Sequence, residues 1–168
     1  MPWIKHLVGC PLFEGLDEGR IAIFRPATRQ VHFAANEMIM TEGEKGEDLL
    51  ILIEGQVTIS KKMTLLAEDA ETSTTDKTFL SLDASSKPFF GEMGLLMNDS
   101  TRTATVKSNS VCEIVELDKD RFWEVCAANP EIGFKVMVNI GRRLANNLQR
   151  ENQNVLKLTT AFSLVLEE

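Results

Sequence analysis

Short apolar or alternating segments, closely punctuated by turn residues, are the feature that most constrains the fold of this 168-residue chain. Turn signals recur about every eight to twelve residues, a spacing typical of an antiparallel β-roll or barrel and not of a parallel sheet. The expected strands span residues 30–33, 38–41, 49–53, 57–60, 105–109 and 111–117, with another resuming at Phe79 and Leu80. We expect 105–109 and 111–117 to pair with each other. The polar stretch 63–77 is expected to be a mobile hairpin tip, more consistent with a solvated loop than with a partner-binding one.

Capping signals place helices at both ends of this series. Asp17 is expected near the N-cap of a short helix that Pro26 ends, and Asp118 caps a second helix. The sequence Asn-Pro-Glu at residues 129–131 starts a third helix, which has no later proline and extends to about Ala161. The fold class is therefore mainly β with flanking helices: a β-roll or jelly-roll barrel closed by a long C-terminal helix.

The chain divides into two regions on this interpretation. Residues 1–128 hold the helical N-terminus, the roll and its following short helix, and residues 129–168 hold the C-terminal helix, which provides a hinge or lid and a possible dimerisation segment. Gly133 and Gly141 lie inside that helix, where each costs about 1 kcal/mol relative to Ala, so each marks either close packing or a hinge. Arg142 and Arg143 are expected to form a solvated helix face.

Composition excludes several classes of function. The net charge is −7, with 18 Lys and Arg against 25 Asp and Glu, which disfavours contact with nucleic acid. Cys10, Cys112 and Cys126 fit no metal or redox spacing and are expected to be small buried side chains in a reducing, cytoplasmic compartment. The N-terminus lacks the apolar core of a signal peptide, and no stretch of 18 apolar residues occurs, so no membrane partner is expected.

One run of residues carries the chemistry. Phe90-Gly91-Glu92-Met93-Gly94-Leu95-Leu96 is followed by Arg102-Thr103-Ala104-Thr105-Val106. A cyclic nucleotide presents one phosphate negative charge and a free ribose 2′-OH, so its site needs a cation, amide donors and an acceptor. The run offers all three: the planar fork of Arg102, the N–H groups of a short helical turn beginning at Glu92, and the Glu92 carboxylate.

This run resembles the phosphate-binding cassette of the cyclic-nucleotide-binding domain family, and every fixed position of the family's pattern is filled. The resemblance implies that Glu92 takes the ribose 2′-OH and Arg102 the cyclic phosphate. The remaining cassette positions expected to line or complete the ligand pocket are Gly91, Met93, Gly94, Leu95, Thr103 and Ala104. The first half of the roll also resembles the family, except that Asn36 stands where glycine is usual; asparagine tolerates the left-handed conformation, which preserves the turn.

The long helix is similar to the corresponding helix of the catabolite activator branch of the family. By that resemblance Asn147 reaches the base, and its amide suits adenine, which favours cyclic AMP. The hydroxyl of Thr103 can instead accept from the 2-amino group of a syn guanine, which keeps cyclic GMP open. In that branch a DNA-binding domain follows the helix; this chain ends at Glu168, so we expect output through a separate effector protein and not through nucleic acid.

A partial heptad on the same helix favours a homodimer. Leu148, Val155 and Phe162 recur at intervals of seven, as do Leu158 and Val165 with Leu144 upstream. The alternative is that the end of the helix, from Phe162 to Leu166, folds back over the roll.

The expected function is that of a regulatory binding module, not an enzyme, with no cofactor or metal. Three alternatives stay open: a surface ion pair between Glu92 and Arg102 without ligand, a degenerate ligand-free domain used for protein contacts, and a cupin-like metal-binding barrel. The cupin alternative is the weakest, because such barrels cluster histidines and this chain has only His6 and His32.

Overall fold

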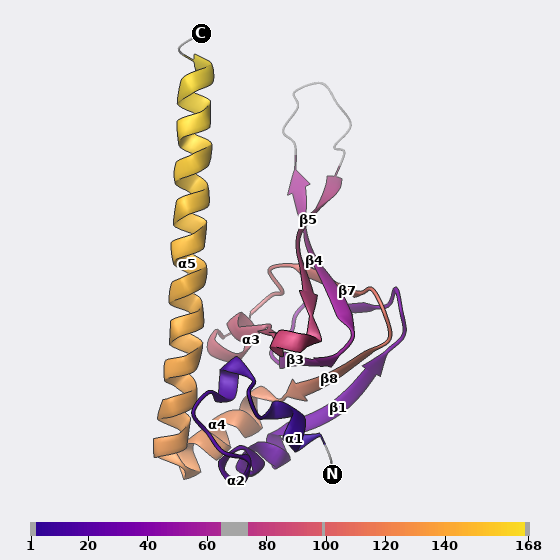
Figure 1. Cartoon of the computed structure of the whole chain (residues 1–168), viewed down its shortest axis with the longest axis vertical. Coiled ribbons are helices and arrows are strands. Elements are labelled where there is room, and N and C mark those ends of the chain that lie inside the picture. The colour runs from indigo at the N-terminus through magenta and orange to yellow at the C-terminus, as the bar shows by residue number, and fades with distance from the viewer. Residues whose placement is uncertain (1–2, 65–73, 99, 167–168) are drawn as a thin grey trace.

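The computed structural model describes residues 3–64, 74–98 and 100–166 and shows two four-stranded antiparallel sheets stacked as a β-roll (Figure 1). One sheet has the order β1-β8-β3-β6 and the other β2-β7-β4-β5. The strands are β1 (Thr28–Phe33), β2 (Met38–Met40), β3 (Leu49–Glu54), β4 (Gln56–Thr64), β5 (Thr74–Asp83), β6 (Phe89–Phe90), β7 (Thr105–Ser108) and β8 (Cys112–Leu117). The expected fold class is confirmed.

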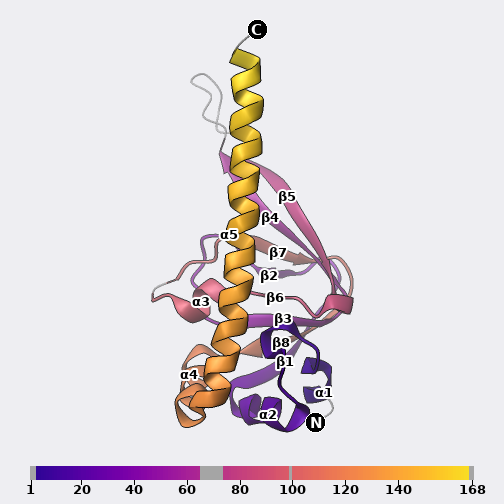
Figure 2. The same ribbon diagram turned by 60° about the vertical axis from the view of Figure 1, so that its left-hand side comes forward.

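Helices cover the outer face of the first sheet. The α-helices are α1 (Ile4–Leu7), α2 (Glu18–Ile21), α3 (Glu92–Leu96), α4 (Lys119–Ala128) and α5 (Pro130–Leu166), and the 3₁₀ segments are η1 (Pro11–Phe13), η2 (Ala22–Ala27) and η3 (Ala84–Ser86). Figure 2 shows α1, α2, α4 and the base of α5 gathered below β1, β3 and β8. No helix in the described ranges is long and apolar enough to cross a membrane.

The continuous apolar run of β3 follows from burial on both sides. Leu50 and Leu52 belong to the core between the sheets, and Leu49 and Ile51 belong to the core beneath the helices. Because successive side chains of a strand point to opposite faces, one strand serves two cores only if every position is apolar. This double burial fixes the first sheet between the roll and its helices.

Both predicted N-caps are confirmed. The Asp17 carboxylate accepts from the Arg20 N–H at 2.9 Å, and the Asp118 carboxylate accepts from the Arg121 N–H at 3.0 Å. Pro26, however, does not end its helix: it lies inside η2, which ends one residue later at Ala27. Its missing N–H removes only one bond from a short 3₁₀ segment, so the segment survives it.

The predicted pairing of 105–109 with 111–117 is wrong. Both segments form strands, but β7 pairs with β2 and β4 whereas β8 pairs with β1 and β3. The turn between them carries the chain from one sheet to the other and packs against Gly55, whose φ is +93° and where a Cβ would overlap the Val111 carbonyl. Burial of both strands around a shared core outweighs the local hairpin.

Two further turns decide the outline of the roll. Asn36 has φ +68°, so the turn expected from its tolerance of the left-handed region is confirmed. The predicted loop 63–77 is too long, because β4 and β5 stay paired as far as Thr64 and Thr74. The rest of that stretch, 65–73, lies outside the described residues.

The C-terminal helix is one continuous element that extends beyond the expected end at Ala161 (Figure 1). Its base packs into the helical core through Val136 and Ile140. Further along, the side chains of Leu148, Val155 and Phe162 are 63%, 61% and 67% exposed. The fold-back alternative is therefore wrong for this structure, because the helix continues without a bend back and Phe162 is exposed instead of packed on the roll.

The two helical glycines play different roles. Gly133 is buried against α4, and a Cβ there would lie 2.8 Å from Cys126 Cβ and 3.1 Å from its backbone; around Gly141 nothing lies within 4 Å. Gly133 is thus a packing contact, and Gly141 is not.

We predict that Gly133→Ala lowers the free energy of unfolding by about 1–3 kcal/mol, since the backbone of α4 must move. Gly141→Ala, the matched control, should raise it by about 0.5–1 kcal/mol through helix propensity alone. Urea denaturation of both variants measures the difference. Equal stabilisation by the two substitutions would contradict the packing role of Gly133.

Candidate functional site

The candidate site forms around the side chain of Arg102. Arg102 lies outside the strands, in the connection from α3 to β7 and three residues before β7 begins. Its backbone is nonetheless hydrogen-bonded on both sides: its N–H donates to the Glu44 carbonyl and its carbonyl accepts from the Gly43 N–H, each at 2.8 Å. The Gly-punctuated turn before β3 therefore fixes where Arg102 lies.

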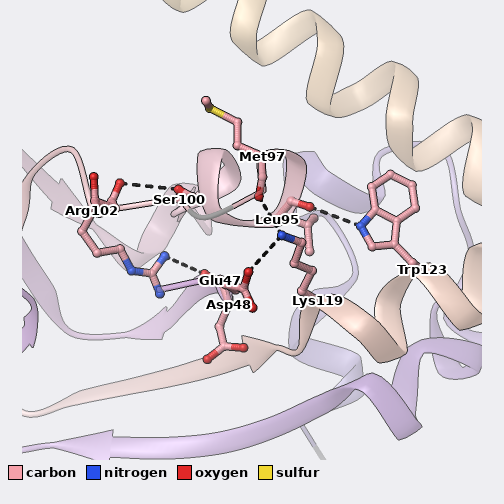
Figure 3. A network of polar contacts seen from close by, with 9 residues as sticks. Glu47, Asp48, Leu95, Met97, Ser100, Arg102, Lys119 and Trp123 are labelled. Carbon is pink, nitrogen blue, oxygen red and sulfur yellow. Dashed lines mark hydrogen bonds and ion pairs between the residues drawn. The ribbon is translucent and has the colours of Figure 1, made fainter. Parts of the chain in front are cut away.

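The guanidinium is anchored by a backbone acceptor. Arg102 Nη1 donates to the Asp48 carbonyl oxygen at 2.8 Å (Figure 3). The register of the first sheet brings the other half of the site to the same place, since β3 and β6 pair with Leu50 opposite Phe90. Just beyond this pairing, a Cβ on Gly91 would lie 2.9 Å from the Asp48 carbonyl oxygen, so the two segments meet there.

Three glycines lie so close to the guanidinium that a side chain at any of these positions would crowd it. A Cβ on Gly46 would overlap Arg102 Nε, and one on Gly91 or Gly94 would lie 2.8 or 3.2 Å from Nη1. Gly91 also has φ +84°, a left-handed conformation that glycine adopts without strain. Gly46 was not among the predicted site residues, although the Gly-x-x-Gly turn that contains it was visible in the sequence.

The predicted cassette residues differ in their exposure. Glu92 begins α3 after the N-cap Gly91, which confirms the expected helical turn, and its side chain is half-buried. Met93 is 37% exposed, whereas Leu95 is buried in the core beneath the helices. Thr103 is exposed and Ala104 half-buried. In the described part of the chain no ion pair joins Glu92 to Arg102, so the surface ion-pair alternative is not observed.

Burial dominates the electrostatics of the site. It lowers the pKa of the Arg102 guanidinium, against the opposing effect of the Asp48 and Glu116 carboxylates, yet an arginine remains a cation throughout the physiological range. Burial also raises the pKa of Asp48, with Asp118 and Glu47 adding to the rise and Arg102 and Arg29 opposing it. The site therefore holds a half-buried positive charge whose anchor to the protein is a neutral carbonyl.

Of the three polar residues that the sequence analysis singled out on the long helix, Arg143 departs from its expected environment. Asn147 is half-buried, its Oδ1 accepts from Arg150 Nη2 at 3.5 Å, and within the described residues no hydrogen bond joins it to the cassette. Arg143 was predicted to be solvated, and this prediction is wrong. Its guanidinium lies 4.6 Å from the ring centroid of Phe89. Arginine covers aromatic faces readily, and the base of α5 brings it there. Arg142 is exposed as expected.

The cysteines and histidines lie away from the cassette's chemistry. Cys10, Cys112 and Cys126 are all buried and free, as predicted, and burial raises the pKa of Cys10 and of Cys126 to about 11. His6 and His32 are exposed. Across the described ranges no three His, Cys, Asp or Glu side chains are arranged to hold a metal ion.

Comparison with known proteins identifies the class to which this architecture belongs. Residues 30–129 match the family described as the cyclic nucleotide-binding domain, and the chain belongs to that family. It is 32% identical over 129 residues to the cAMP-activated global transcriptional regulator CRP of Haemophilus influenzae, which covers 77% of this chain and 53% of that protein. It is 27% identical over 147 residues to a CRP-like cAMP-activated global transcriptional regulator of Mycobacterium tuberculosis, covering 88% of this chain and 59% of that protein. The chain thus spans about half the length of the curated relatives that it matches.

Solved structures share the fold at lower identity. The catabolite activator protein of Thermus thermophilus superposes with a TM-score of 0.74 at 21% identity, covering 89% of this chain and 63% of that one. The regulatory domain of Toxoplasma gondii PKA, solved with cAMP, gives 0.66 at 19% identity, covering 86% and 49%. The resemblance inferred from the cassette is confirmed at the level of family and fold.

The raised pKa of Asp48 predicts a pH-dependent effect of its substitution. An acid whose pKa is higher in the folded than in the unfolded state destabilises the fold when ionised, so its cost appears as the pH rises through that folded pKa. Asp48→Asn should therefore raise the melting temperature at pH 7 relative to the parent, and the gain should shrink at pH 3, where both side chains are neutral.

Asp83→Asn is the matched control with the opposite sign. Hydrogen bonds from the backbone and side chain of Ser85 and from Gln56 lower the pKa of Asp83, so this substitution should cost stability at pH 7 and less at pH 3. Thermal melts at both pH values measure the two differences. A gain from Asp48→Asn that is equal at the two pH values would contradict the burial of an ionised carboxylate.

Proposed function

We propose that this chain binds a 3′,5′-cyclic nucleotide at the cassette, with the cyclic phosphate on Arg102 and the ribose 2′-OH on Glu92. The observation that carries the proposal is the half-buried Arg102 guanidinium, which is anchored through one nitrogen to the Asp48 carbonyl and enclosed by glycines. A guanidinium has five donors in a planar fork, and the anchor uses one of them. The phosphate takes the remaining edge, because two phosphate oxygens match that fork.

The start of α3 supports the same placement. The Gly94 N–H donates to the carbonyl of the N-cap Gly91 at 3.0 Å, so the N–H groups of Glu92 and Met93 precede the intrahelical hydrogen bonds. Such groups are free to donate to an anion. Gly91, Met93 and Thr103 line the pocket in this proposal, and Gly94, Leu95 and Ala104 support it from behind.

The proposed ligand is cyclic AMP in preference to cyclic GMP. The Haemophilus influenzae relative is described as cAMP-activated, and the Toxoplasma gondii structure contains cAMP. In this chain Asn147 contacts the adenine edge once α5 approaches the cassette, whereas Thr103 is the residue that favours guanine. We further propose a cytoplasmic regulatory module without catalytic activity, which passes occupancy through movement of α5 to a separate effector protein.

Arg102→Ala should weaken cyclic AMP binding by roughly ten- to more than a hundredfold, because a charge-assisted contact contributes about 1.5–3 kcal/mol. Arg142→Ala, which removes an exposed arginine from α5, is the control and should bind like the parent. Isothermal titration calorimetry with both cyclic nucleotides measures the affinities. Unchanged affinity in a folded Arg102→Ala variant would contradict the assignment of the cyclic phosphate to Arg102.

The same titrations separate the two bases. A parent that prefers cyclic GMP, and that loses this preference in Thr103→Ala but not in Asn147→Ala, would contradict the choice of cyclic AMP. A parent that binds neither nucleotide would favour the ligand-free, protein-contact alternative.

The second proposal is a homodimer through α5. The exposed large apolar side chains of this part of the helix are Leu148, Val155, Leu156, Leu158 and Phe162. A continuous helix with Leu148, Val155 and Phe162 in heptad spacing and largely in contact with solvent fits a second copy of the same helix. The dimer buries this stripe, which the single chain leaves exposed.

Leu148→Glu combined with Val155→Glu should convert the dimer into a monomer, since charges placed in an apolar interface lack partners. Asn146→Glu combined with Asn154→Glu adds the same charge at exposed positions beside the stripe and should leave the dimer intact. Sedimentation velocity distinguishes the two species. A parent that sediments as a monomer at high micromolar concentration would contradict the homodimer through α5.

A further inference from the structure

Lys119, the first residue of α4, contacts both the end of α3 and the loop that precedes β3. Its Nζ donates to the Met97 carbonyl oxygen at 2.6 Å and lies 3.2 Å from Glu47 Oε1 (Figure 3). The Lys119 side chain is 13% exposed, whereas that of its partner Glu47 is 56% exposed. Neither Lys119 nor Glu47 belongs to the cassette motif.

Each contact of Lys119 holds one segment of the site: the end of α3 or the loop before β3. Met97 is the C-cap of α3, and a cation at a helix C-terminus satisfies carbonyl groups that have no partner within the helix. Glu47 immediately precedes Asp48, whose carbonyl anchors Arg102. Lys119 thereby connects the helix that begins at Glu92 with the loop that holds the guanidinium.

Trp123 lies one helical turn after Lys119 and makes a parallel contact. Its indole Nε1–H donates to the Leu95 carbonyl oxygen at 3.2 Å. Residues four apart lie on the same face of a helix, so Lys119 and Trp123 together hold two carbonyls at the end of α3 against α4.

The helix that carries these two side chains is itself firmly placed. Phe122 stacks on Phe24 with ring centroids 5.7 Å apart and an interplanar angle of 22°, and Arg121 Nη1 donates to the Pro26 carbonyl at 3.1 Å. Phe122 is fully buried. The end of α3 is therefore held against α4, a helix that is itself packed into the core.

We infer that Lys119 is a positioning residue of the cyclic nucleotide site, which, with Trp123, holds α3 at the correct separation from the 46–48 loop before ligand arrives. The inference rests on the proposed function. Its physical basis is preorganisation: a ligand that meets a site already in its bound geometry does not spend binding free energy on ordering it. Lys119 touches no ligand atom in this account and acts through Met97 and Glu47.

The test is cyclic AMP titration of Lys119→Met and Lys119→Arg. Methionine keeps the unbranched stem without a donor, so affinity should fall about tenfold, whereas arginine keeps the donors and should restore most of it. Lys107→Met, at an exposed position on β7, is the matched control and should bind like the parent.

A double-mutant cycle separates positioning from a general effect on stability. Glu47→Gln, which leaves α4 untouched, should also weaken binding, and its effect should largely disappear in the Lys119→Met background because both act through one contact. If Lys119→Met does not fold, Glu47→Gln against the parent still decides.

The outcomes separate the two proposals. A parent that binds neither cyclic nucleotide overturns the proposed function and the inference with it. A parent that binds, together with a folded Lys119→Met or Glu47→Gln that binds equally tightly, overturns the inference alone. A loss of affinity in Lys119→Met that arginine does not restore, or that adds fully to the loss from Glu47→Gln, also overturns it.

Discussion

The contact between the Arg102 guanidinium and the Asp48 carbonyl is the interaction on which the rest of the site depends. A cation taken partly out of water needs acceptors, and a carbonyl supplies one without neutralising the charge. The glycines at 46, 91 and 94 follow from the same requirement, because a Cβ at any of them would crowd the guanidinium. The charge is thus held in place while one edge of its fork keeps its donors.

The sheet makes this arrangement possible by pairing distant segments. Asp48 precedes β3 and Gly91 follows β6, and the antiparallel register of these two strands brings the ends together. The register in turn is fixed because β3 supplies side chains to two cores, so a slip of one residue would exchange the faces of every side chain. Packing some distance from the site therefore sets the spacing at Arg102.

The sequence predicts local features of this protein well and distant contacts poorly. The caps at Asp17 and Asp118, the left-handed turn at Asn36 and the short helix at Glu92 depend on residues within a few positions, and the structure has them. The ordered cassette motif also identified the family, which the comparisons confirm.

The features that the sequence analysis predicted wrongly or did not predict are contacts between elements that are distant in the sequence. The separation of β7 from β8 follows from which strands share a core. The packing of Arg143 on Phe89 and the contacts of Lys119 with Met97 and Glu47 arise only after the helices dock on the roll. Lys119 and Trp123 are four residues apart, which puts them on one helix face, but no local pattern indicates what that face contacts.

The length of α5 gives small movements at its base a disproportionate result. Its 37 residues span roughly 55 Å at about 1.5 Å per residue, and only the first part is fastened to the body, where Asn139 Nδ2 donates to the Leu12 and Glu14 carbonyls. The helix is a lever with its fulcrum at that end. A tilt of about 5° at Asn139 displaces side chains about 10 Å away by about 1 Å and moves the tip, about 40 Å away, through roughly 3.5 Å. The fold can thus convert an adjustment smaller than a methyl group into a displacement as large as a whole side chain.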